Sequence, residues 1–163
     1  MSDERTPEGI EYTSAEGAVI SYPGCFVCGE NNTQGLALKF TWDGLVCRTE
    51  FTASEQFAGY RRVLHGGIIA SILDEVMIKA ILAQGIIAVT GELTIKYRSP
   101  ARSGDLLSFT GEVTEQSARL IRTVGRALND AGDLIAEAHA KYVVVRDRVF
   151  LGELTKSLVG GKE

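Results

Sequence analysis

The chain has 163 residues, of which 45% are apolar and 23% are charged, a composition typical of a folded globular domain. The formal net charge of −4 argues against a general nucleic-acid or anionic-membrane binder, which needs a basic surface. Any anionic substrate therefore has to be bound by a local group of Arg or Lys side chains.

The N-terminus is polar and acidic and has no apolar segment typical of a secretory signal. No apolar run approaches the roughly 18 residues that a membrane span needs, so we expect no membrane partner. The chain has three cysteines, an odd number, and a chain of this size does not need disulfides for stability. These features predict a cytoplasmic protein with free thiols.

Residues 1–21 show no clean periodicity and are predicted to form an N-terminal arm. Residues 22–150 are predicted to form one domain, and residues 151–163 a short, weakly patterned C-terminal tail. The domain begins with a loop rich in Gly and Asn up to Gly35. Two β-like segments, Leu36–Thr41 and Leu45–Phe51, flank an Asp-Gly pair and predict a hairpin.

A helix is predicted from Gly66 to about Gln84, with Gly85 as its C-terminal cap. Its apolar residues recur at three- and four-residue steps and cover most of the circumference, so other structure should enclose it. Four β-like segments follow, at residues 88–98, 106–116, 120–129 and 134–146. This order predicts an α+β fold in which a curved antiparallel sheet wraps around one central helix.

Asp74 shares a face of the predicted helix with Gly67 and Ala70, so a ligand or another chain has room to approach its carboxylate. Glu75 precedes Lys79 by four residues in the favourable orientation and is interpreted as a partnered, solvated charge. A carboxylate inside an apolar helix is rare, because burial of an unpaired charge is costly. Asp74 is therefore the first candidate for a catalytic group.

His65, Gly66 and Gly67 open the same helix. Free backbone N–H groups and the positive end of the helix dipole favour a developing negative oxygen there, and glycine lets a substrate approach the backbone. With a carboxylate about two turns further on, this pattern suits attack of water, or of the carboxylate itself, on a carbonyl. The plainer alternatives are a capping histidine and an ordinary Gly-Gly loop.

The segment Val63–Met77, VLHGGIIASILDEVM, resembles the central-helix signature of the PaaI-like, or 4-hydroxybenzoyl-CoA-type, hotdog thioesterases. The leader Cys25–Leu36, CFVCGENNTQGL, is similar to that of a subgroup related to thioesterase superfamily member 4. The segment Thr90–Pro100, followed by Gly104 and Asp105, resembles the next strand and turn of the family. The resemblance covers roughly residues 22–146 and implies a hotdog fold.

The resemblance implies that Asp74 is the catalytic general base or nucleophile and that Thr90 holds the attacking water across a dimer interface. It also implies that the Gly66 amide polarises the thioester carbonyl and that His65 helps to orient this carbonyl. Many relatives have an Asn six residues before the His, where this chain has Gly59.

The expected function is hydrolysis of an acyl-CoA to a free acid and CoA, by a homodimer or homotetramer with shared active sites and no cofactor. A non-catalytic acyl-CoA-binding or regulatory hotdog protein is the alternative, favoured by Gly59. An enoyl-CoA hydratase of the same fold fits less well, because we expect it to use a different motif. Substrate contacts are expected at Gly67 and, for the CoA phosphates, at arginines that flank the motif and the following turn: Arg61, Arg62, Arg98 and Arg102.

Cys25 and Cys28 form a lone C-x-x-C pair, which is a weak metal signal. A structural zinc has four ligands, and the remaining Cys and His residues are only Cys47, His65 and His139. The βαβ context of a redox motif is also missing. We therefore expect no metal, and both cysteines are interpreted as packing residues of the leader loop.

Overall fold

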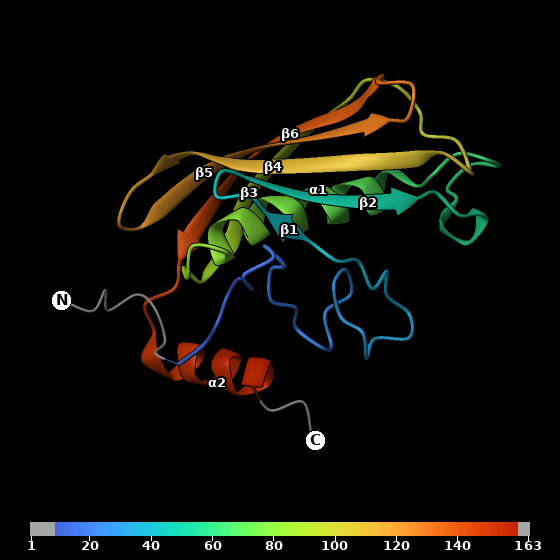
Figure 1. The fold of residues 1–163 in the computed structure, drawn as a ribbon. Coiled ribbons are helices and arrows are strands. Elements are labelled where there is room, and N and C mark those ends of the chain that lie inside the picture. The colour runs from blue at the N-terminus through green and yellow to red at the C-terminus, as the bar shows by residue number, and fades with distance from the viewer. Residues whose placement is uncertain (1–8, 160–163) are drawn as a thin grey trace.

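The computed structural model describes residues 9–159. Six strands form one antiparallel sheet in the order β1-β2-β4-β5-β6-β3, and the long helix α1 (Gly66–Leu82) lies along its concave face (Figure 1). A 3₁₀ turn (Glu55–Phe57) precedes α1, and a second helix, α2 (Arg148–Val159), follows the last strand. The strands are β1 (Thr41–Trp42), β2 (Val46–Thr52), β3 (Ala88–Tyr97), β4 (Leu106–Gln116), β5 (Leu120–Asn129) and β6 (Leu134–Val144).

Helix α1 is enclosed, as its apolar circumference predicts. Ile72, Leu73, Val76 and Met77 are fully buried between the sheet and the segments on the opposite side. The helix lies directly on β4 at Gly111, where a Cβ atom would stand 2.6 Å from the carbonyl oxygen of Val76. This close contact fixes the position of α1, and therefore of the side chains that it carries, relative to the sheet.

The predicted strands after the helix are confirmed to within two residues at each end, but the predicted hairpin is wrong in its first strand. β1 contains only Thr41 and Trp42, because the backbone before it pairs with other segments. Leu36 N donates to Phe26 O at 2.8 Å, and Leu38 N donates to Val27 O at 2.8 Å. The leader loop therefore takes the hydrogen bonds that a longer β1 would have given to β2.

The turn between β1 and β2 is held by the side chain of Asp43. Its Oδ1 accepts hydrogen bonds from the backbone N–H groups of Leu45, at 2.9 Å, and Val46, at 2.7 Å. The hydrogen bond from Val46, followed by that from Arg48, lowers the pKa of Asp43 to about 2. The predicted Asp-Gly turn is thus present, with Gly44 in the left-handed conformation at φ 97°.

The side of α1 that faces away from the sheet is covered by the N-terminal segment, the leader loop and α2 (Figure 1). Tyr12 and Leu82 belong to a small buried cluster against which Leu151 and Leu154 of α2 pack. The tail that we expected to be weakly patterned therefore forms a helix. Two N–H groups of its first turn donate to the Asp147 side chain, a capping signal that the sequence analysis missed. Residues 1–8 and 160–163 lie outside the described residues.

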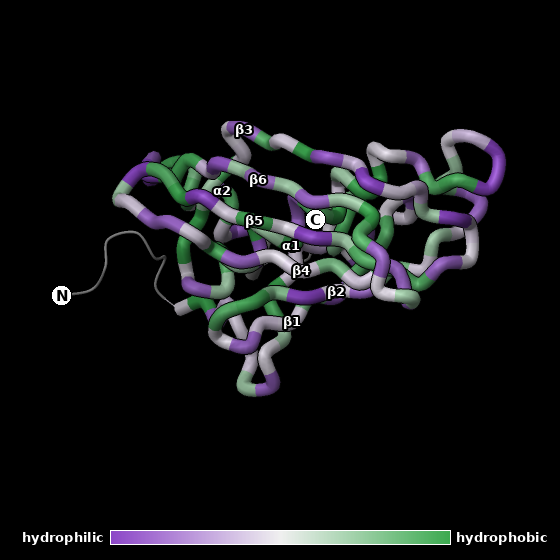
Figure 2. The backbone as a smooth tube through the Cα atoms, turned by 90° about the horizontal axis from the view of Figure 1, so that it is seen from above, coloured by the Kyte–Doolittle hydropathy of each residue, from purple (hydrophilic) through white to green (hydrophobic). Residues whose placement is uncertain are grey.

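Strand β3 lies at one edge of the sheet and pairs only with β6 among the described strands (Figure 2). Val89 and Tyr97, near its two ends, are 43% and 51% exposed. A ten-residue edge with free backbone N–H and C=O groups is a template for pairing with another strand. No helix in the described part of the chain is long and apolar enough to span a membrane.

Candidate active site

The carboxylate of Asp74 lies in the middle of α1, half-buried and held by two hydroxyl groups. Thr90 Oγ1, on β3, donates to Asp74 Oδ1 at 2.9 Å and lies 3.2 Å from Oδ2. Tyr142, on β6, donates to Oδ1 at 2.8 Å and lies 3.0 Å from the Asp74 carbonyl oxygen. The structure thus brings Asp74 and Thr90 together within a single chain and adds Tyr142, which the sequence analysis missed.

Tyr142 is fully buried, and a buried phenol needs a hydrogen-bond acceptor. Burial, and then the negative charge of Asp74, raise the pKa of Tyr142, so its hydroxyl remains a proton donor at neutral pH. A sequence signal for it did exist. Tyr142 is the one large residue with a polar end among the alternate, inward-facing positions of β6. The other residues at these positions are small or β-branched: Ala136, Ala138, Ala140 and Val144.

At the start of α1, His65 acts as the N-terminal cap. Its Nδ1 accepts a hydrogen bond from Gly67 N–H at 2.8 Å, and a Cβ atom at Gly67 would lie 2.9 Å from this nitrogen. The Gly67 amide is therefore engaged with His65. The Gly66 N–H has no acceptor among the described residues, while the Gly66 carbonyl accepts a hydrogen bond from Tyr97 Oη at 2.7 Å. One free amide thus points out of the helix end.

Gly66 and Asp74 of one chain lie too far apart to reach a single carbonyl. Asp74 follows Gly66 by eight positions on α1, which corresponds to about 12 Å along the helix axis. The free N–H groups at a helix start also point away from the rest of the helix, so an oxygen bound there lies still further from Asp74. The arrangement expected from the sequence, with both groups at one carbonyl, therefore requires the two groups to come from different chains.

The four candidate arginines are all exposed, and three of them lie near one another. Val63 forms a β-bridge with Arg102, and the Arg62 carbonyl accepts a hydrogen bond from Ser103 N, so the turn with Arg61 and Arg62 meets the turn after β3. Arg98 pairs with Glu137 at 3.1 Å. Arg98 also lines a groove of about 340 Å³ that reaches Gly66 and Tyr97 at the helix start.

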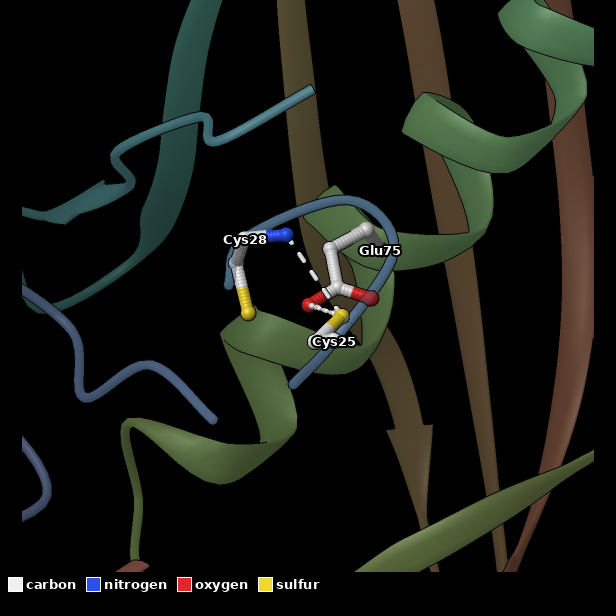
Figure 3. Close-up of side chains that lie close together, drawn as sticks. All are labelled: Cys25, Cys28 and Glu75. Carbon is white, nitrogen blue, oxygen red and sulfur yellow. Dashed lines mark hydrogen bonds between the residues drawn. The ribbon is translucent and has the colours of Figure 1, made fainter. Parts of the chain in front are cut away.

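The prediction that Glu75 is a solvated charge is wrong. It does lie near Lys79, with 3.8 Å between the Lys79 Nζ and Oε1, but neither charge is solvated. The Lys79 side chain is only 2% exposed and that of Glu75 is 17% exposed, because the leader loop covers this face of the helix. Cys25 Sγ lies 3.7 Å from Glu75 Oε1, and Cys28 lies beside them (Figure 3).

The charges in this second cluster are strongly perturbed. Burial raises the pKa of Glu75 to about 7, against the opposing effect of the Lys79 ammonium. The Cys28 thiol, as a hydrogen-bond donor, together with the backbone N–H groups of Cys28 and Val27, lowers the pKa of Cys25 to about 5. The hydrogen bond to Cys25, and then burial, raise the pKa of Cys28. These hydrogen bonds favour the thiolate form at Cys25 over the thiolate form at Cys28.

Comparison with known proteins assigns the family. Residues 62–136, which include Gly66, Asp74 and Thr90, match the family model of the thioesterase superfamily. Acyl-coenzyme A thioesterase 13 of Homo sapiens is 32% identical over 98 residues, which are 58% of this chain and 70% of the relative. The chain belongs to the thioesterase superfamily. As a member of this superfamily, it is a thioester hydrolase.

Two solved structures confirm the fold. The Escherichia coli PaaI protein superposes with a TM-score of 0.61 at 24% identity, over 63% of this chain and 79% of that chain. A Streptococcus mutans protein solved with acetyl CoA bound superposes with a TM-score of 0.61 at 19% identity, over 66% of this chain and 88% of that chain. The sheet and central helix of this thioesterase are therefore the hotdog fold expected from the sequence.

Proposed function

We propose that this thioesterase hydrolyses acyl-CoA to a free acid and CoA, with Asp74 as the general base. The observation that carries the proposal is the carboxylate held by the Thr90 and Tyr142 hydroxyls at 2.9 and 2.8 Å. Both hydroxyls donate to Oδ1, so Oδ2 has the capacity to accept a proton from water that Thr90 helps to hold. The acyl-CoA substrate is supported by the name of the human relative and by the acetyl CoA in the Streptococcus mutans structure.

In the proposed reaction, Asp74 removes a proton from water, and the water oxygen attacks the thioester carbonyl carbon. The carbonyl oxygen becomes negative and accepts a hydrogen bond from the free Gly66 N–H, aided by the positive end of the α1 dipole. His65 keeps this amide free, because it binds the neighbouring Gly67 N–H instead. Collapse of the intermediate breaks the carbon–sulfur bond, and the proton held by Asp74 passes to the departing CoA sulfur, which regenerates the carboxylate.

The distance of about 12 Å along α1 supports a homodimer in which Asp74 and Thr90 of one chain face Gly66 of the other. The exposed edge of β3 supports the same assembly, since pairing with a second β3 edge satisfies its free backbone groups. Two equivalent sites then form in each dimer. A tetramer would contain two such dimers.

The arginines near the helix start are proposed to bind the phosphates of CoA. Arg98 lines the groove that reaches Gly66, and the turns that carry Arg61, Arg62 and Arg102 meet nearby. Guanidinium groups bind phosphate oxygens with paired hydrogen bonds, and a local cluster is needed because the whole chain is acidic.

The test is thiol release from a panel of acyl-CoA substrates. Asp74→Asn should lower kcat by several orders of magnitude, and Thr90→Val should lower it by less. Gly66→Pro removes only the N–H at the first helical position, which tolerates proline, and His65 before it is already extended at φ −61° and ψ 130°. We expect a loss of roughly a hundredfold or more in kcat for this variant.

Gly66→Ala is the matched control, because it keeps the amide and its Cβ would meet Tyr97 only at an ordinary 3.5 Å. An Asp74→Asn variant with the wild-type rate would remove Asp74 from the mechanism. Tight acyl-CoA binding in calorimetry without any turnover would instead identify a binding protein.

A further inference from the structure

We propose that Cys25, Cys28 and Glu75 form a zinc site between the leader loop and helix α1. One ligand atom from each residue lies within 4.8 Å of the other two (Figure 3). Ligands of a tetrahedral zinc, at about 2.3 Å for sulfur and 2.0 Å for oxygen, stand roughly 3.5–3.8 Å apart. The Cys25 sulfur is already 3.7 Å from Glu75 Oε1, so only a small contraction is needed.

The leader loop holds the Cys25 sulfur atom in place before any metal binds. The backbone N–H groups of Val27 and Cys28 both point at the Cys25 sulfur, at 3.4 Å each, which favours a thiolate. The loop is closed by a hydrogen bond of 2.9 Å from Gly29 N to Cys25 O. A Cβ atom at Gly29 would lie 2.5 Å or less from backbone atoms of Pro23 and Cys25, so this turn needs glycine directly after the second cysteine.

The charges of the cluster favour a divalent cation. Two thiolates and a carboxylate carry three negative charges, and the buried Lys79 ammonium, 3.8 Å from Glu75 Oε1, compensates one of them. Lys79 also donates to the Ile20 carbonyl, which keeps its ammonium in this position. A zinc ion would compensate the remaining two charges in a place where water is largely excluded. Thiolate sulfur selects zinc over magnesium or calcium, which prefer oxygen ligands.

The proposed site has a route for entry and room for a fourth ligand. A cavity of about 260 Å³ reaches Cys25 and Glu75, and apolar side chains of α1, β3 and α2 form most of its remaining wall. Within residues 9–159, the group contains no fourth Cys, His, Asp or Glu. The fourth position of a zinc held by these three residues would therefore be filled by water or by a small ligand from the cavity.

The sequence alone does not indicate this zinc site. The only further Cys and His residues, Cys47, His65 and His139, do not complete a set of ligands with the C-x-x-C pair, and the spacing of Glu75 from Lys79 predicts a solvated charge. In the structure, helix α1 places Glu75 under the leader loop, 47 residues after Cys28 in the numbering of the chain. The C-x-x-C pair therefore gains a buried carboxylate ligand that no local motif indicates.

The test is a zinc titration of the full-length, metal-free protein under a phosphine reductant, in competition with a chromophoric chelator. We expect one zinc per chain. Cys25→Ser and Cys28→Ser should each weaken binding on the order of a hundredfold, and Glu75→Gln should weaken it on the order of tenfold. Cys47→Ser, which changes a fully buried free cysteine outside the group, is the matched control and should bind as tightly as the wild type.

Cobalt(II) provides a second readout that reports the ligands directly. The wild-type complex should show sulfur-to-cobalt charge-transfer bands, weaker by about half in each single cysteine variant. Circular dichroism of each variant establishes that it is folded. The proposal is overturned if the reduced wild type binds no zinc, if folded Cys25→Ser binds it equally well, or if Cys47→Ser loses it to the same extent.

Discussion

Two inactive variants of this thioesterase should regain activity when they share a dimer. Asp74→Asn removes the proposed base, and Gly66→Pro removes the proposed oxyanion donor. In a mixed dimer, the intact Asp74 comes from the Gly66→Pro chain and the intact Gly66 from the Asp74→Asn chain. One of the two sites is then complete, and the other carries both defects.

The expected recovery follows from the geometry of α1. Eight residues at 1.5 Å each place Asp74 about 12 Å from Gly66 along the axis, with the free N–H directed away from Asp74. A hydrogen bond of about 2.9 Å and one water molecule cannot bridge this distance to a single carbonyl. A site shared between chains therefore gives the mixed dimer about half of the wild-type kcat, since one of its two symmetric sites is complete.

The assay needs the mixed dimer in pure form. The two variants are co-expressed with different affinity tags, purified over both tags, and compared with each variant alone and with a dimer of wild type and Asp74→Asn. This last dimer also has one complete site and sets the upper limit. If the doubly tagged mixed dimer shows no more activity than either parent, the shared-site geometry is refuted.

Three further predictions concern stability and positioning. Tyr142→Phe should lower kcat and cost about 1–3 kcal/mol of unfolding free energy, because Asp74 loses a buried donor. Gly111→Ala should cost about 1–3 kcal/mol, since its Cβ would meet the backbone of α1 at 2.6 Å. The stability that Asp43 contributes should be present above its unfolded pKa near 3.8 and be lost as pH falls toward its folded pKa of about 2.

Each of these predictions has its own measurement. Urea unfolding gives the two free energies, and Gly152→Ala, in open space on α2, is a control that should be neutral or stabilise by up to about 1 kcal/mol. An unchanged Gly111→Ala midpoint would contradict the close packing of α1. Thermal unfolding between pH 5 and pH 2 should fall less steeply for Asp43→Asn than for wild type, and parallel curves would exclude a contribution from Asp43.

The sequence was sufficient to predict the central helix and the strands after it, because periodicity is a local property. The β-like patterns at residues 106–116 and 120–129 predict two strands, and the bounds of β4 and β5 in the structure are the same. The strand predicted at Leu36–Thr41 is largely absent because its backbone pairs with Phe26 and Val27. Hydrogen bonds to a preceding loop have no characteristic pattern in the local sequence. Tertiary pairing there overrides a β-like pattern.

In the candidate site, too, some residues have a local signal in the sequence and others are placed only by the tertiary structure. Asp74 is visible in the sequence because a carboxylate is unusual inside an apolar helix, and Gly66 because glycine at a helix start lets a substrate approach the backbone. Tyr142 is brought to Asp74 by the register of β6 against β3, in which Thr90 pairs with Tyr142. The environment of Glu75 depends on where the leader loop lies, and a spacing of four residues from Lys79 is the same whether the pair is solvated or buried.

Helix α1 has a further consequence in the proposed dimer. Each copy of the helix supplies its start to one site and its middle to the other, and these two parts belong to one continuous helix of 17 residues. A ligand that displaces the helix start in one site therefore also displaces Asp74 in the other. Binding at the two sites is then linked by a coupling free energy. This linkage is reciprocal, so a ligand in either site changes the affinity of the other site by the same factor.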